Sequence, residues 1–205
     1  MSTIKKILVV HSEQDDLTIQ GDVKGWVTNF FKFLSSLLVH MNYGDLLLEL
    51  RSLSQLKQSE LKKNIIVVLV VSPLLAPENK GYQMISSWLK QMATPQKGVQ
   101  DDAERCLIVH KTIFNFESFP ELLSLNNYQL YEIDNTTGLP REINRFFGLE
   151  AEKNYWMKLI DLSFDISRYL SFDEKRVKEK FINKREKTVY LAEVGKDLIV
   201  QRDMM

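Results

Sequence analysis

The sequence predicts an α/β fold: a five-stranded parallel sheet with flanking helices and a C-terminal helical extension. Several runs of β-branched and aliphatic residues lack polar alternation, which indicates strands buried on both faces, as in parallel sheets. Amphipathic segments separate these runs, and strand and helix patterns alternate about five times, as in a doubly wound sheet. A hydrophobic content of 44% supplies enough apolar surface for one such core.

The first half of the chain contains two predicted strands and a long helix. Residues 7–10 are wholly apolar and form the first strand, and the polar residues 11–16 follow it. Residues 23–41 form an amphipathic helix, because their apolar side chains recur at intervals of three and four residues. These side chains are Trp26, Phe30, Phe33, Leu34, Leu37 and Leu38. A second strand is predicted at residues 46–50, and the polar residues 54–63 favour a helix.

The strongest strand signal is residues 65–71, an unbroken run of isoleucine, valine and leucine that indicates the centre of the sheet. A helix is predicted over residues 82–92, with one apolar stripe. That stripe contains Met84, Ile85, Trp88, Leu89 and Met92. Residues 106–109 and 129–133 form the fourth and fifth strands of the prediction. Residues 140–147 then form a short helix, since proline is tolerated in a helix's first turn.

A second region begins after Gly148, where a helix is predicted over residues 152–170. Its apolar stripe consists of Tyr155, Leu159, Leu162, Ile166 and Tyr169. The simpler interpretation is that this stripe docks on the sheet domain. The alternative is that it binds a partner protein or a second copy of the chain.

Three regions follow from this pattern. We expect an α/β domain at residues 1–150 and a helical extension at residues 151–187, whose mixed-charge second half is a solvated helix or linker. Residues 188–194 look like one more strand. Residues 188–205 are therefore interpreted as the start of a second domain or as a tail.

Composition excludes several classes of function. The 27 basic and 27 acidic residues cancel, so no global basic field attracts nucleic acid or anionic lipid. The single cysteine, Cys106, excludes an internal disulfide and a cysteine-based zinc cluster. No phosphate-binding loop, dinucleotide fingerprint, hydrolase elbow or zincin motif occurs. No apolar run suits a signal peptide or membrane span, so we expect a cytoplasmic protein without a resident cofactor or metal.

The candidate site is the edge of the sheet where the parallel strands end. In the flavodoxin-like strand order 2-1-3-4-5, ligands bind at the carboxyl ends of the first and third strands. Ser12, Asp15 and Ser72 occupy those ends and are the candidate binding residues. Capping of turns and helices is the simpler interpretation of Ser12, Asp15 and the neighbouring Asp16, and a hydrogen-bonding role at the strand end is the simpler interpretation of Ser72. His11 and His110 each follow a predicted strand, and as an alternative they would meet at this edge as acid–base groups.

Four stretches resemble bacterial TIR (Toll/interleukin-1 receptor-type) domains. Residues 6–16, KILVVHSEQDD, resemble the family's first box, a strand followed by a serine and acidic residues. Residues 65–77 resemble the strand ending in serine that precedes the family's glutamate-bearing helix. Residues 139–166 resemble the tail of TIR-like domains that open larger signalling proteins. Residues 187–203 are similar to the start of a second such domain.

The resemblance implies a protein-interaction or signalling module of a bacterial signalling or defence protein. In NAD-cleaving members a glutamate is catalytic, and here its position falls at Gln83 or Met84. Cleavage of the nicotinamide–ribose bond passes through an oxocarbenium-like state that a carboxylate stabilises. We therefore expect a module without catalysis.

Two alternatives remain open. In the first, the protein cleaves NAD, with Glu78 as the catalytic carboxylate near the third strand. In the second, the protein is a small-molecule sensor that uses Asp15 and Asp16 as acidic groups at the end of the first strand.

Overall fold

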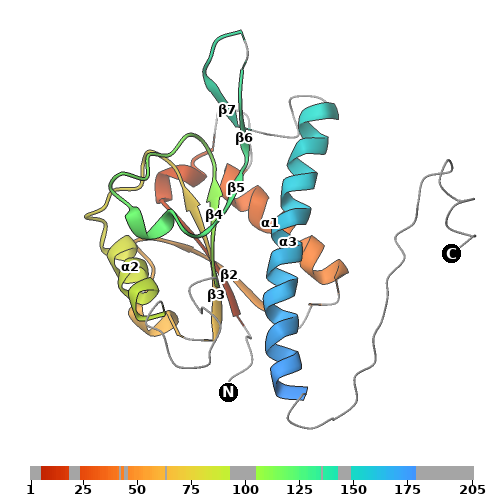
Figure 1. Ribbon diagram of the computed structural model, residues 1–205. Coiled ribbons are helices and arrows are strands. Elements are labelled where there is room, and N and C mark those ends of the chain that lie inside the picture. The colour runs from red at the N-terminus through yellow and green to blue at the C-terminus, as the bar shows by residue number, and fades with distance from the viewer. Residues whose placement is uncertain are drawn as a thin grey trace, which may run out of the picture.

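Five strands form one sheet in the order β2-β1-β3-β4-β5 in the computed structural model (Figure 1). Every neighbouring pair in this sheet is parallel. The strands are β1 (Lys6–His11), β2 (Leu47–Ser52), β3 (Ile65–Val71), β4 (Cys106–His110) and β5 (Asn126–Gln129). The structure describes residues 6–18, 24–41, 43, 46–62, 64–92, 105–134, 136–142 and 149–178. The predicted α/β class and flavodoxin-like strand order are confirmed.

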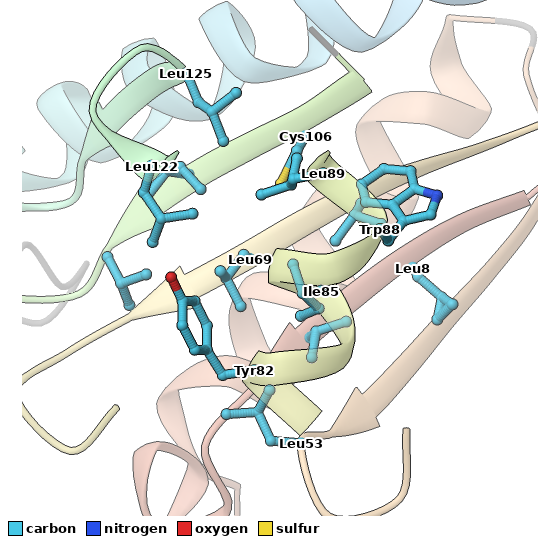
Figure 2. Packing of buried hydrophobic residues seen from close by; sticks show 14 of the residues in the cluster. Leu8, Leu53, Leu69, Tyr82, Ile85, Trp88, Leu89, Cys106, Leu122 and Leu125 are labelled. Carbon is cyan, nitrogen blue, oxygen red and sulfur yellow. The ribbon is translucent and has the colours of Figure 1, made fainter. Parts of the chain in front are cut away.

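Helices cover both faces of the sheet, which explains why its central strands are apolar at every position. All seven residues of β3 are buried. On one face, α1 (Trp26–His40) and α3 (Leu149–Lys178) pack against the strands and share one hydrophobic cluster with them (Figure 1). On the other face, α2 (Lys80–Met92) packs with the 3-10 turn η4 (Pro120–Leu122). A second 3-10 turn, η2 (Gln58–Glu60), lies in the chain between Leu56 and Leu61, which are buried in the same cluster. Figure 2 shows Tyr82, Ile85 and Trp88 of α2 in this second cluster.

Helix α3 is the helical extension of the prediction, and it covers the sheet rather than leaving it. The five side chains of its predicted stripe are all buried in the cluster that α1 and the sheet also form. Docking within the chain, the simpler of the two interpretations, is therefore the arrangement in this structure. Tyr155, Leu159, Leu162, Ile166 and Tyr169 are not on a surface that a partner reaches while α3 stays docked.

A β-hairpin replaces the start of the helix predicted at residues 140–147. Strands β6 (Tyr131–Ile133) and β7 (Pro140–Glu142) pair antiparallel in a sheet of their own, which projects beyond the parallel sheet in Figure 1. Gly138 turns the chain with φ 67°, and its amide donates to the Asp134 carbonyl at 2.7 Å. Proline also fits the first position of a strand, so it did not distinguish the two structures.

Two other expectations differ from the structure at their boundaries. The fifth strand of the parallel sheet is β5, because Tyr131 and its neighbours belong to the hairpin. In place of the helix predicted at residues 54–63, the described residues of this stretch contain only the short turn η2, and two leucines explain why. Leu56 and Leu61 are buried in the α2-side cluster, and a spacing of five residues does not fit one helical face. The predicted stretches 143–148 and 188–194 lie outside the described residues.

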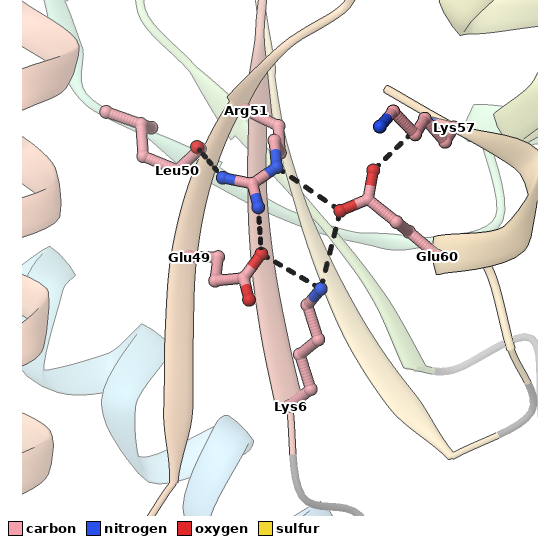
Figure 3. A network of polar contacts seen from close by, with 6 residues as sticks. All are labelled: Lys6, Glu49, Leu50, Arg51, Lys57 and Glu60. Carbon is pink, nitrogen blue, oxygen red and sulfur yellow. Dashed lines mark hydrogen bonds and ion pairs between the residues drawn. The ribbon is translucent and has the colours of Figure 1, made fainter. Parts of the chain in front are cut away.

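Charged side chains cover the α2-side face of the sheet near the edge strand β2 (Figure 3). The ammonium Nζ of Lys6 in β1 lies 2.9 Å from Glu49 Oε2 and 3.5 Å from Glu60 Oε1. The Arg51 guanidinium forms ion pairs with both of these glutamates, and its Nε lies 3.2 Å from Glu60 Oε1. Two cations and two carboxylates thus balance each other beside an exposed strand edge. Charged residues at such an edge oppose pairing with another chain.

Candidate functional site

The carboxyl ends of β1, β3 and β4 meet at one edge of the sheet, where the turn η1 (Glu13–Asp16) follows β1. The polar sequence of η1 contains three carboxylates: Glu13, Asp15 and Asp16. Each of them contacts a different neighbouring part of the fold. The acidic stretch that looks like one cluster in the sequence therefore serves three separate sets of contacts.

Asp15 is the buried carboxylate of this edge, with 0% of the residue exposed. Its Oδ2 accepts a hydrogen bond from the Ser72 hydroxyl at 3.0 Å. Ser72 is itself buried, and its Oγ accepts from the Leu74 amide at 3.1 Å. The structure thus brings two of the candidate residues, Asp15 and Ser72, into direct contact across β1 and β3.

Lys111 completes the surroundings of Asp15 and directly follows β4. Its Nζ donates to the Asp15 carbonyl oxygen at 3.0 Å and lies 3.8 Å from Asp15 Oδ1. Among the described residues, none donates a hydrogen bond to that Oδ1. Burial raises the pKa of Asp15 above its ordinary value, whereas the Ser72 hydrogen bond and the Lys111 charge act to lower it.

Sequence reasoning missed Lys111, although a signal was present. Lys111 follows β4 at the position where Ser72 follows β3, and the structure pairs the preceding residues Val71 and His110. In a parallel sheet, residues that end neighbouring strands lie side by side. The same logic that singled out Ser72 would have included Lys111.

Asp16 points to helix α1 and acts as a remote cap. The residue that precedes α1 is Gly25, which has no side chain to cap the helix. Asp16 Oδ1 instead accepts from the Thr28 amide at 2.7 Å, and its Oδ2 accepts from the Thr28 hydroxyl. This satisfies one of the amides that a helix start leaves without an intrahelical partner. Capping, the simpler interpretation of Asp16, is therefore what this residue does, although the helix that it caps begins ten residues further along the chain.

Glu13 is directed toward the loop after β2. It accepts hydrogen bonds from Ser52 at 3.2 Å and from Ser54, and these bonds hold its pKa below the ordinary value. Ser12 is half-buried and contributes through its backbone, because its carbonyl accepts from the Asp15 amide at 3.0 Å. Its side chain provides no cap to η1.

Glu78 lies on the loop ahead of α2 and is exposed, unlike Asp15 and Ser72. Gln83 is exposed on the first turn of α2, and Met84 packs against the α2-side cluster. The carboxylate candidates therefore differ sharply in accessibility. Asp15 is shielded from solvent, whereas Glu78 faces it.

The two buried histidines each have a partner of their own. His11 Nδ1 lies 2.8 Å from the Ser12 carbonyl oxygen, and His110 Nε2 lies 2.7 Å from Asn127 Oδ1. The His110 ring also packs edge-on against Phe116. Burial lowers the pKa of His110, which favours its neutral form, and the Asn127 bond opposes this effect. In the described contacts the two rings do not meet as an acid–base pair.

The residues that the structure describes contain no group of three or more histidine, cysteine, aspartate or glutamate side chains arranged to hold a metal ion. Within the same residues, no helix combines the length and the apolar character needed to cross a membrane.

Comparisons of the chain with protein-family models, curated proteins and solved structures find no match.

Proposed function

We propose that this chain is a TIR-like protein-interaction module of a cytoplasmic bacterial signalling or defence protein, and that it does not cleave NAD. The observation that carries the proposal is the engaged state of Asp15 at the carboxyl edge of the sheet. This buried carboxylate contacts Ser72 and Lys111, so its role is to stabilise the fold rather than to bind a substrate. The resemblance to TIR domains supplies the functional class.

The chemistry of NAD cleavage supports the second half of the proposal. A carboxylate that stabilises an oxocarbenium-like state must touch the ribose of the substrate. The Asp15 side chain is 1% exposed, so a substrate cannot reach it without local opening. Gln83 is accessible on α2 but carries no charge.

The proposal places partner contacts on surfaces other than the buried stripe of α3. That stripe is occupied by the sheet and α1, so its exposure would remove a large part of the core. Contacts with a partner protein or a second copy are therefore expected without undocking of α3.

Self-association and NAD cleavage can be measured on the same preparation. We expect the weight-average mass from sedimentation to rise with protein concentration, or a neighbouring domain of the same protein to bind in calorimetry. We also expect no nicotinamide release when the chain is incubated with NAD. A chain that stays monomeric at high concentration and binds no neighbouring domain would contradict the interaction proposal.

The exposed position of Glu78 favours one second candidate, an NAD-cleaving enzyme. Glu78 lies just ahead of α2, on the loop that follows β3. Comparison of Glu78→Gln with the control Glu117→Gln, another exposed glutamate, tests this candidate. Nicotinamide release that is lost in the first variant and kept in the second would replace our proposal with the enzyme.

A further inference from the structure

The turn η1 holds two neighbouring carboxylates that are engaged on different sides. Asp15 bonds to Ser72 at the end of β3 and lies beside Lys111 at the end of β4. Asp16, the next residue, caps α1 through both the amide and the hydroxyl of Thr28. One short turn therefore joins the carboxyl edge of the sheet to the start of α1, which covers one face of the sheet together with α3.

A close steric contact strengthens the connection between η1 and α1. A β-carbon added to Gly25 would lie 2.0 Å from the Asp16 carbonyl oxygen and 2.3 Å from its Oδ1. The backbone before α1 therefore sits directly against Asp16, at a distance that only glycine permits. A displacement of Asp16 thus acts on α1 through both the hydrogen bonds and this contact.

The covalent geometry of η1 limits independent movement of the two carboxylates. Their α-carbons are joined by a single peptide unit, which is planar and stiff. The Asp15 amide also donates to the Ser12 carbonyl at 3.0 Å, which ties the turn to the end of β1. Rotation of the Asp15 backbone would consequently reorient Asp16 and weaken the cap on Thr28.

We propose that η1 is a mechanical link, in which the contacts of Asp15 with Ser72 and Lys111 set the stability of the first turn of α1. An event that disturbs this edge of the sheet, such as the binding of a partner, would then be transmitted to α1. The helix α1 shares its hydrophobic cluster with α3, so the effect would reach the helical layer. This inference does not rest on the proposed function.

Hydrogen exchange in the full chain tests the link, with the Thr28 amide as reporter. In Ser72→Ala, which removes the hydroxyl donor to Asp15, we expect the Thr28 amide to exchange about tenfold faster, a change typical of a lost local contact. Asp15→Ala, which removes both the acceptor of the Ser72 hydrogen bond and the carboxylate beside Lys111, should accelerate the same amide further. Amides at the centre of β3 should change less than Thr28 in both variants.

Two controls separate this local effect from general destabilisation. Ser52→Ala removes a partner of Glu13 but leaves Asp15 and Asp16 untouched, so Thr28 should exchange as in the natural chain. Leu122→Ala weakens the core on the opposite face and should accelerate all slow amides together. Equal acceleration of Thr28 and β3 in Ser72→Ala would overturn the proposal.

A double-mutant cycle gives a second measurement that does not depend on whether the Asp15→Ala variant folds. Ser72→Ala and Thr28→Val share no direct contact, so without the link their effects on the unfolding equilibrium constant should multiply. With the link, we expect the double variant to deviate from that product by about threefold or more. Effects that simply multiply would overturn the proposal even if the exchange rates change.

Discussion

At the scale of single residues, Asp15 contributes to the pH dependence of stability at the carboxyl edge of the sheet. Burial raises its pKa in the folded protein, so the folded state takes up a proton more readily than the unfolded chain. As pH falls through the raised pKa toward the ordinary value of 3.8, this group makes the fold more stable. Ionised Asp15 is therefore a cost that Ser72 and Lys111 reduce.

We expect this contribution to appear as a difference between the natural chain and Asp15→Asn. Urea unfolding of both proteins between about pH 7 and about pH 3, a range that extends below the ordinary Asp and Glu values, should show the natural chain gaining stability relative to the variant as pH falls. Glu13→Gln is the control of opposite sign, because the pKa of Glu13 is lowered and its stabilisation is lost on acidification. If the free energies of unfolding of the natural chain and Asp15→Asn changed in parallel with pH, burial would not raise the pKa of Asp15.

At the scale of elements, the approach of α2 to the end of β2 depends on one glycine. A β-carbon on Gly81 would lie 2.1 Å from the carbonyl oxygen of Leu53, which is a backbone atom and cannot swing aside. Asn79 caps the same turn by accepting from the Gly81 amide at 2.9 Å. The first turn of α2 is thus fixed by a cap and by a close backbone contact.

Gly81→Ala should push this turn away from the sheet. We expect it to lower the free energy of unfolding by about 1–3 kcal/mol, the usual cost of overpacking a buried position. Lys80→Ala, at the neighbouring exposed position, should change it by less than about 0.5 kcal/mol. Chemical denaturation of the two variants beside the natural chain measures both effects. Equal stability of Gly81→Ala and Lys80→Ala would mean that α2 shifts without cost.

The elements that could be predicted from the sequence are those whose signal is local. The strands β1, β3 and β4 were found because burial on both faces requires apolar side chains at every position. The β6–β7 hairpin was missed because Pro140 suits both a helix start and a strand start. The signal that decides between them, Gly138 with positive φ, depends on a backbone conformation that the sequence does not state.

The candidate site was predictable in position but less so in its contacts. Ser72 and Asp15 were placed at the same edge because parallel strands end together. The cap that Asp16 provides to Thr28 spans 12 residues, and the contact between Lys111 and Asp15 spans 96. Such contacts depend on how the loops lie over the sheet edge. Local patterns carry little information about that arrangement.

At the scale of the whole molecule, α3 joins two parts of the fold besides covering the sheet. Tyr128 of β5 donates a hydrogen bond to Asp165, and Asn126 donates to the Tyr169 hydroxyl at 3.0 Å. Asn154, near the other end of the helix, donates to Glu132 of the hairpin at 2.7 Å. Polar contacts thus fix the position of α3 along β5 and β6, while its buried stripe supplies the apolar contact with the sheet.

A matched pair of substitutions on α3 measures how firmly the helix belongs to this core. Leu162 is fully buried, whereas Phe164, two residues later, is 61% exposed on the opposite side of the helix. We expect Leu162→Ala to lower the free energy of unfolding by about 2–5 kcal/mol, because it leaves a cavity beneath the helix. Phe164→Ala removes a larger side chain but should cost less than about 0.5 kcal/mol.

Urea unfolding followed by circular dichroism measures the loss of unfolding free energy in both variants. Comparison of the two losses shows whether α3 unfolds together with the sheet or leaves it easily. A large cost for Leu162→Ala with a single cooperative transition means that α3 and the sheet unfold as one unit. A small cost for both variants would mean that α3 leaves the sheet easily in solution. The stripe from Tyr155 to Tyr169 would then be free to bind a partner, and the placement of partner contacts in our proposal would have to change.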